Sequence, residues 1–167
     1  MTDTPVRPAP RASGRRSLVL GLAALCCGLG KSLQAATPTD LPLSESLVDE
    51  LKAALQAHLP LVVLVSLEGC PHCELARNAH LAPLRRRGQP VVQVDWRSPR
   101  RLQDFWGGAH THDAMVRQWR ISVAPTVLFF GADGREIAPR LAGGVLPDFY
   151  GAYLEARLET ARKNLRA

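Results

Sequence analysis

Three short runs of apolar residues, rich in β-branched side chains, recur along the chain, and each is bounded by proline, glycine or charged residues. Runs of this kind, without alternation of apolar and polar positions, are typical of strands buried on both faces of a sheet. The predicted strands are 61–67, 90–95 and 123–130.

Apolar residues also return every three or four positions in longer stretches, which indicates amphipathic helices. Ser44 can cap a helix that runs to about His58, and a second helix begins at Cys70. This second helix should kink or stop near Ala82, because a residue that precedes a proline, here Pro83, disfavours helical backbone. The remaining predictions are an irregular and then helical segment over 96–120, broken at Gly107-Gly108, and a final helix that uses Phe149, Tyr153, Leu154 and Leu158.

The turn signals between these elements indicate the topology. Ala132-Asp133-Gly134 is a hairpin signal, so the segment 135–141 should run antiparallel to the strand before it. Alternating helices and buried strands predict an α/β fold with a central mixed sheet of about four strands flanked by helices. At 167 residues and with no internal repeat, the chain has room for one domain of ordinary size plus a tail.

The net charge of the chain resides mostly in its first 35 residues. The formal net charge is +6, but residues 1–35 hold five basic residues and one acidic residue, a net of +4, which leaves +2 for the remainder. A strongly basic surface is therefore not expected on the folded part, and nucleic acid is not predicted as a partner.

The beginning of the chain has the features of an export signal. A polar, arginine-bearing stretch precedes a run of 13 apolar residues, Leu18–Gly30, and small residues follow at Ala35 and Ala36. The apolar run is too short for a membrane span, which needs roughly 20 residues, and it matches the apolar core of a signal peptide. We therefore predict cleavage near Ala35–Ala36 and a periplasmic location.

Three parts of the chain follow from this interpretation. Residues 1–36 are the export signal, 37–43 are a proline-rich lead-in, and 44–164 are the folded domain. The pair Arg15-Arg16 leaves twin-arginine export and ordinary secretory export both open. An uncleaved N-terminal anchor is the alternative to cleavage.

Cysteine usage indicates chemistry in the folded domain. Of four cysteines, Cys26 and Cys27 lie inside the apolar run and should leave with the signal. Cys70 and Cys73 remain, three positions apart. A disulfide between them closes almost no loop, so it would stabilise the fold little and is better explained as a redox centre.

The position of the pair assigns a role to each of its residues. Cys70 follows a buried strand and begins a helix, with Pro71 in the first turn, where a missing N–H has no cost. Free N–H groups and the helix dipole favour a thiolate at Cys70, which makes it the nucleophile. Cys73 lies one turn further on, where it can attack a mixed disulfide and release the product. The ring of His72 can stabilise the Cys70 thiolate.

With these residues in place, the chain resembles the thioredoxin superfamily, and in particular its small exported members, over residues 44–160. The Cys-Pro-His-Cys motif at 70–73 is a pattern also found in the DsbA type of disulfide donor. The segment 124–130, Ala-Pro-Thr followed by Val-Leu-Phe-Phe, is similar to the cis-proline strand of the superfamily.

The resemblance implies a thiol–disulfide oxidoreductase that acts on protein thiols and disulfides, with no cofactor beyond the redox-active Cys70–Cys73 disulfide. It also implies that Pro125 is cis and lies against the two sulfurs. Ala124 would then offer its backbone to an extended substrate segment, beside Gly69. A membrane protein would supply or accept the electrons.

The chain departs from the thioredoxin pattern at two positions near the cysteines. Many thioredoxins bury a carboxylate six residues before the first cysteine, where it moves protons for the second, and here that position is Leu64. The tryptophan that precedes the first cysteine in the family is replaced by Gly69, which removes an apolar wall from the substrate face.

A third departure is a surplus segment at 97–112, which is longer than a minimal thioredoxin needs. It combines Arg100 and Arg101 with Phe105 and Trp106, a composition enriched at interface hot spots. We predict that it sets the choice of partner. In the alternative interpretation, the two aromatic side chains cover one face of the sheet.

The direction of electron flow and the class of function both have alternatives. His72 favours a DsbA-like disulfide donor, whereas the missing helical insertion domain of that type favours a reductase or interchange role. A thioredoxin-fold copper or metal chaperone would add His110 and His112 to Cys70 and Cys73 as ligands. Family copper carriers favour a wider cysteine spacing, so no metal is predicted. A non-catalytic binding module would require the cysteine pair to be idle.

Overall fold

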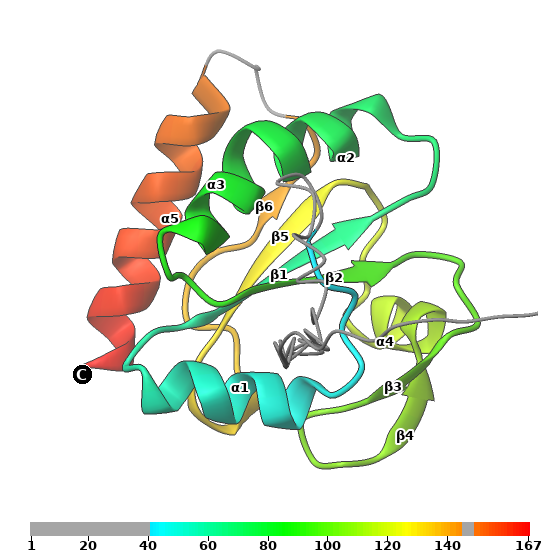
Figure 1. Ribbon diagram of the computed structural model, residues 1–167, viewed down its shortest axis with the longest axis horizontal. Helices are drawn as coiled ribbons and strands as arrows, with labels where there is room; N and C mark the ends of the chain where they lie inside the picture. Colours follow the sequence, from blue (N-terminus) through cyan, green and yellow to red (C-terminus); the bar gives the residue numbers. More distant parts are fainter. Residues whose placement is uncertain (1–40, 145–148) are drawn as a thin grey trace, which may run out of the picture. The chain divides into compact units, whose positions relative to one another are not determined.

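The computed structural model describes residues 41–144 and 149–167, so the predicted export signal with Cys26 and Cys27 lies outside the described residues. The elements and their arrangement are shown in Figure 1. In chain order they are α1 (Leu47–Gln56), β1 (Leu61–Ser66), α2 (Pro71–Leu75), the π-helical segment η1 (Ala76–Leu81), α3 (Ala82–Arg86), β2 (Val91–Asp95), β3 (Arg101–Gln103), β4 (Ala109–Thr111), α4 (His112–Gln118), β5 (Thr126–Phe130), the 3₁₀ turn η2 (Ala132–Gly134), β6 (Leu141–Ala142) and α5 (Tyr150–Leu165).

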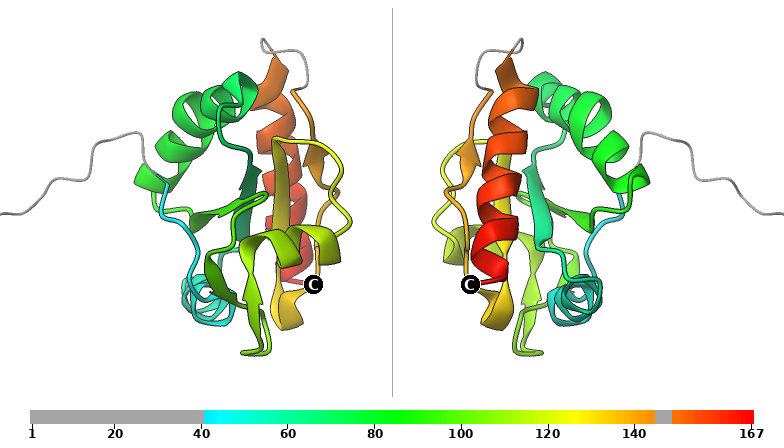
Figure 2. Two further views of the ribbon diagram at one scale, coloured as in Figure 1. Left: turned by 90° about the vertical axis from the view of Figure 1, so that its right-hand side faces the viewer. Right: turned by 90° about the vertical axis from the view of Figure 1, so that its left-hand side faces the viewer.

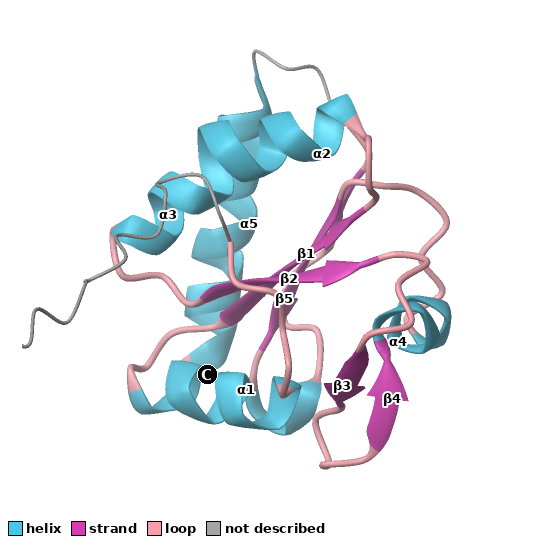
Figure 3. Cartoon of the chain, turned by 45° about the vertical axis from the view of Figure 1, so that its right-hand side comes forward, coloured by secondary structure: helices cyan, strands magenta, loops and turns pink. Residues whose placement is uncertain are grey.

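Four strands form the central sheet in the order β2-β1-β5-β6, and β3 pairs with β4 in a separate hairpin. β2 runs parallel to β1, and β5 is antiparallel to β1 (Figure 3). β6 is antiparallel to β5. This confirms the predicted mixed sheet of four strands flanked by helices. The strand predicted over 135–141 is shorter than expected, because beyond β6 it contributes a single bridge between Glu136 and Phe130.

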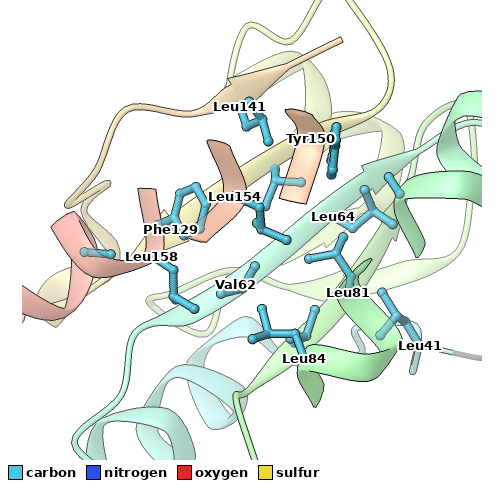
Figure 4. Packing of buried hydrophobic residues seen from close by; sticks show 14 of the residues in the cluster. Leu41, Val62, Leu64, Leu81, Leu84, Phe129, Leu141, Tyr150, Leu154 and Leu158 are labelled. Carbon is cyan, nitrogen blue, oxygen red and sulfur yellow. The ribbon is translucent and has the colours of Figure 1, made fainter. Parts of the chain in front are cut away.

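Alternating residues of β1 face two separate hydrophobic cores, which explains why its first five residues, 61–65, are all apolar. Val62 and Leu64 face the core beneath α5 and the helical segment 71–86, where Leu154 and Leu158 meet them (Figure 4). The opposite face of the sheet packs against α1, α4 and the hairpin. The buried residues of this second core include Leu47, Leu51, Leu61, Val63, Val65, Met115, Val116, Leu128 and Phe130.

The first helix begins two residues later than predicted. Its N-cap is Ser46, whose Oγ accepts a hydrogen bond from the backbone N–H of Asp49 at 3.3 Å. Ser44 is buried, and its hydroxyl donates to the Glu50 carboxylate instead. The two serines look equivalent as caps in the sequence, and the tertiary position of Ser44 against β2 decides between them, since its N–H bonds the Gln93 carbonyl at 2.8 Å.

The second helix was predicted to kink or stop near Ala82. It does not stop there, because helical backbone continues through α3 to Arg86, but its regular α-helical pattern is interrupted by η1 just before Ala82. The N–H of Ala82 bonds the carbonyl of Arg77, five residues back, as in a π-helix. This wider turn immediately precedes Pro83. It relieves the clash that a proline ring makes with the carbonyl four residues back in a regular α-helix.

Two of the four residues predicted for the apolar face of α5 are exposed to solvent. Phe149 and Tyr153 are 56% and 45% exposed, whereas Tyr150 is buried beside the predicted Leu154 and Leu158. Tyr150, Leu154 and Leu158 share the four-residue spacing of one helix face. Within residues 41–144 and 149–167, none of the helices combines the length and apolar character that crossing a bilayer requires.

Candidate redox site

Cys70 and Cys73 lie at the beginning of α2 and are joined by a disulfide, with their Cα atoms 5.2 Å apart. Cys70 is the N-cap of the helix, and its Sγ accepts a hydrogen bond from the backbone N–H of Cys73 at 3.2 Å. Cys73 is fully buried, whereas Cys70 is half-buried. The geometry therefore gives one accessible sulfur with an N–H donor directed at it and one inaccessible sulfur behind it.

Glycine is favoured at position 69 by the backbone turn that leads from β1 into the helix. The φ of +68° at Gly69 lies in the left-handed region, which strains any residue with a side chain. The space beside it is open, because a Cβ added there would meet nothing within 4 Å. The absence of an apolar wall before Cys70 thus has a conformational cause, which the sequence alone did not reveal.

A glycine pair that follows β6 borders the same site. The N–H of Gly143 donates to the Pro125 carbonyl at 2.7 Å. A Cβ on Gly144 would approach the ring of the exposed His72 to 3.1 Å, so this loop packs against the residue between the cysteines. Neither glycine was predicted as part of the site, since a Gly-Gly pair before the last helix indicates only a turn or loop.

Pro125 lies just before β5, and the peptide bond that joins it to Ala124 is cis. Pro125 is buried and Ala124 is half-buried. Thr126 pairs with Val65 near the end of β1, so the beginning of β5 lies beside the strand end from which the turn to Cys70 departs. The two segments that carry the predicted site residues are thus neighbours in the sheet.

No carboxylate occupies the position six residues before Cys70, since Leu64 is fully buried in the hydrophobic core. A polar network lies nearby on the side of β2. Arg77 donates from Nη2 to Ser66 Oγ at 2.8 Å and from Nε to Gln93 Oε1 at 2.7 Å. The Gln93 amide in turn donates to Asp95 Oδ1 at 2.6 Å. Sequence analysis missed this network, whose signals are an arginine four residues after Cys73 and a glutamine in an apolar strand.

The structure does not bring the candidate metal ligands together. His112 is buried, and its Nδ1 accepts from the Asp95 N–H at 3.0 Å while its Nε2 donates to the Ser44 carbonyl at 2.9 Å. Burial lowers the pKa of His112, which fits this neutral, doubly hydrogen-bonded ring. His110 contacts Asp104 at 3.1 Å. The described residues contain no group of three or more histidine, cysteine or acidic side chains that could hold a metal ion.

The surplus segment 97–112 contains the β3–β4 hairpin, and its two aromatic residues have different environments. Phe105 is 8% exposed, and its ring centroid lies 4.6 Å from that of Phe130. Trp106 is 71% exposed. The alternative interpretation, in which both rings cover the sheet, therefore applies to Phe105 and is wrong for Trp106. Arg100 and Arg101 are exposed.

The carboxylate of Asp104 fixes the tip of this hairpin. Its Oδ1 accepts from the backbone N–H groups of Trp106 and Gly108 at 2.8 and 2.7 Å. Burial alone would raise the pKa of Asp104, but these N–H groups and the neighbouring His110 lower it overall. The tip is therefore held in one conformation by its own side chain.

The hairpin tip lies at the end of the sheet opposite the redox pair. Phe130, which Phe105 contacts, pairs with Leu61 at the beginning of β1, whereas Cys70 follows the end of β1. Figures 1 and 2 show α2 at one end of the folded unit and the β3–β4 hairpin at the other.

The fold and the close Cys70–Cys73 disulfide together define a thioredoxin-fold protein, and they support thiol–disulfide oxidoreductase chemistry in general. The chain belongs to the thioredoxin-like domain family, whose model matches residues 47–158.

Several solved structures are similar to this chain. One titled DsbH oxidoreductase has a TM-score of 0.51 and 19% identity, covering 80% of this chain and 94% of that one. Mitochondrial thioredoxin 3 from Saccharomyces cerevisiae has a TM-score of 0.47 and 18% identity, covering 74% and 98%. A thioredoxin pre-protein from Schistosoma mansoni has a TM-score of 0.46 and 18% identity, covering 72% and 96%. Comparison with curated protein sequences finds no match.

Proposed function

We propose that this protein is a periplasmic thiol–disulfide oxidoreductase that exchanges disulfides with protein substrates and acts mainly in reduction or interchange. The observation that carries the proposal is the unequal pair of sulfurs. Cys70 is accessible and its Sγ accepts an N–H, whereas Cys73 is buried one turn behind it. Removal of residues 1–36 near Ala35–Ala36 would release the protein into the periplasm.

The proposed reaction is a pair of thiol–disulfide exchanges. The Cys70 thiolate attacks one sulfur of a substrate disulfide, which forms a mixed disulfide and expels the other substrate sulfur as a thiolate. The Cys73 thiolate then attacks Cys70 Sγ, which releases the second substrate thiolate. Two electrons pass to the substrate, and the Cys70–Cys73 disulfide forms. A membrane protein that donates electrons would restore the dithiol.

The substrate segment would lie in an extended conformation against Ala124, beside the open space at Gly69. Pro125 has no N–H, so the backbone of Ala124 is the adjacent group that can pair with an incoming strand. The exposed Arg100, Arg101 and Trp106 would add contacts to a native partner at a distance from the sulfurs. This role of the hairpin is a proposal separate from the chemistry.

Equilibration of the Cys70–Cys73 couple with glutathione buffers tests the direction of electron flow. We expect a potential nearer to the value of about −270 mV typical of thioredoxin than to the value of about −120 mV of DsbA, and catalysed reduction of insulin by dithiothreitol. A potential near the DsbA value with no insulin reduction would assign the chain to the disulfide-donor alternative, which His72 favours.

His72 is expected to stabilise the Cys70 thiolate, because it is exposed beside it on the first turn of α2. Replacement of His72 by Ala should raise the Cys70 pKa and make the couple more reducing. The rate of iodoacetamide alkylation against pH measures this pKa directly. The matched control is Glu74→Gln, an exposed residue on the same turn. An unchanged midpoint in the His72 variant would contradict the assignment.

A further inference from the structure

A cleft of about 1050 Å³ opens beside the redox pair, between the helical segment that begins at α2 and the ends of β1 and β2. Gly69 and Glu74, the residues that flank the two cysteines in sequence, both line it, so its mouth is continuous with the rim of the redox site. The half-buried ring of Trp96 contributes apolar surface to the cleft. Neither cysteine lines the cleft itself, but a substrate segment that extends from Cys70 past Gly69 would reach this opening.

Arg77 is the half-buried cation of this cleft, and its guanidinium is held in a fixed orientation. It donates to two neutral acceptors, Ser66 Oγ and Gln93 Oε1. The amide of Gln93 is itself oriented, because its Nε2 donates to Asp95 Oδ1. Two of the five N–H donors of a guanidinium are thus occupied, and the plane of the group is set before any ligand arrives.

The positive charge of Arg77 lacks a close carboxylate. In the part of the chain that the structure describes, the ion pairs within 4.0 Å involve other cations, and Arg77 is in none of them. Charged groups withdrawn from water are ordinarily paired. Asp95, the carboxylate of this network, accepts a hydrogen bond from the Gln93 amide. The guanidinium of Arg77 therefore keeps N–H donors that no described carboxylate accepts from.

We infer that Arg77 binds a carboxylate of the substrate polypeptide, located within a few residues of the cysteine that reacts with Cys70. The inference rests on the proposed function and adds a substrate preference to it. A planar guanidinium suits a carboxylate, which can accept two parallel hydrogen bonds. The lining carries three carboxylates, those of Glu68, Glu74 and Asp95, against the guanidinium groups of Arg77 and Arg97. This balance disfavours multiply charged anions such as phosphate and restricts the ligand to a single carboxylate that contacts Arg77 directly.

Short peptides test this preference. Each carries one cysteine joined to thiopyridine, whose release is followed by absorbance, and Glu, Gln or Lys occupies each position within three residues of the cysteine. The reduced protein transfers two electrons to this mixed disulfide, which yields the peptide thiol, thiopyridone and the Cys70–Cys73 disulfide. At one or more positions, we expect kcat/KM for the Glu peptide to exceed that for the Gln peptide about tenfold, the contribution of one charge-assisted hydrogen bond.

Three variants separate the role of Arg77 from its structural contacts. Arg77→Gln should abolish the preference for Glu, and Arg77→Lys, which keeps the charge, should retain part of it. Arg85→Gln removes an exposed arginine of the same helical segment outside the cleft and should leave the preference intact. If Arg77→Gln fails to fold, the wild-type protein still tests the inference. Its preference for the Glu peptide must weaken as the salt concentration is raised, because that preference is ionic.

The outcomes distinguish the inference from the function on which it rests. Equal rates for all peptides would overturn the inference and leave the proposed function standing, as would a preference that survives in Arg77→Gln or a faster reaction of the Lys peptide. Failure of every peptide to react would overturn the proposed function, and the inference with it.

Discussion

Replacement of Cys73 by Ser will trap mixed disulfides between Cys70 and protein partners, whereas replacement of Cys70 by Ser will trap none. The accessible Cys70 sulfur can still attack a substrate in the first variant, but no second thiol remains to release the product. In the second variant, the remaining sulfur is fully buried and cannot reach a protein substrate. Insulin reduction should fall to the uncatalysed rate in both variants.

Non-reducing electrophoresis of each variant after acid quenching and alkylation shows the trapped species. The background for both should carry Cys26→Ser and Cys27→Ser, so that cysteines outside the folded domain cannot form adducts. Equal trapping by the two variants would refute the assignment of Cys70 as the nucleophile. Adducts formed by Cys70→Ser alone would reverse the two roles.

Phe105→Ala and Trp106→Ala, which change adjacent residues, should have opposite consequences. Phe105 fills the second core against Phe130, and a Cβ on Gly134 would meet its ring at 2.5 Å, so the ring is enclosed by backbone. Its truncation should lower the free energy of unfolding by about 3–5 kcal/mol. Trp106→Ala should change it by less than about 0.5 kcal/mol, because the side chain is mostly in water.

Guanidinium unfolding at constant pH measures both free energies, and trapping with the Cys73→Ser background measures partner binding. If the hairpin tip recognises a partner, Trp106→Ala in this background should lose native adducts while peptide disulfides react normally. Retention of all native adducts by Trp106→Ala would remove the tip from recognition. A stability loss for Trp106→Ala comparable to that for Phe105→Ala would contradict the environments described for the two rings.

The pattern of apolar residues along the sequence predicted the strands of the sheet because these strands are buried on both faces. The apolar run 61–65 is short and rich in β-branched residues, which favours a strand buried on both faces, and β1 is buried throughout. The turn from β1 to Cys70 was predictable for a related reason, since a closely spaced cysteine pair that begins a helix after such a strand is typical of a redox centre. Pattern failed where two nearby residues fit equally well, as with Ser44 and Ser46.

The missed parts of the site depend on contacts between residues distant in sequence. Arg77 and Gln93 are 16 positions apart, and their hydrogen bond exists because β2 lies parallel to β1 beneath the helix. Gly144 meets His72 because β6 returns antiparallel to β5. Neither contact produces a periodic pattern in the amino-acid sequence from which it could be predicted. The continuation of helix through Pro83 likewise required knowledge of a π-turn, which has no simple sequence signature.

The hairpin tip and the redox pair lie at opposite ends of the sheet. The distance between them therefore limits which partners can bind at the tip and react at Cys70 at the same time. β5 follows β1 from Val65 to Leu61, four residue steps or about 13 Å, and both sites lie beyond these ends. In a partner that binds Trp106, more than about four extended residues must therefore separate the docking surface from the reactive disulfide. With a connection of sufficient length, the disulfide would face Cys70 at a millimolar effective concentration, so that a weakly held partner could still react preferentially.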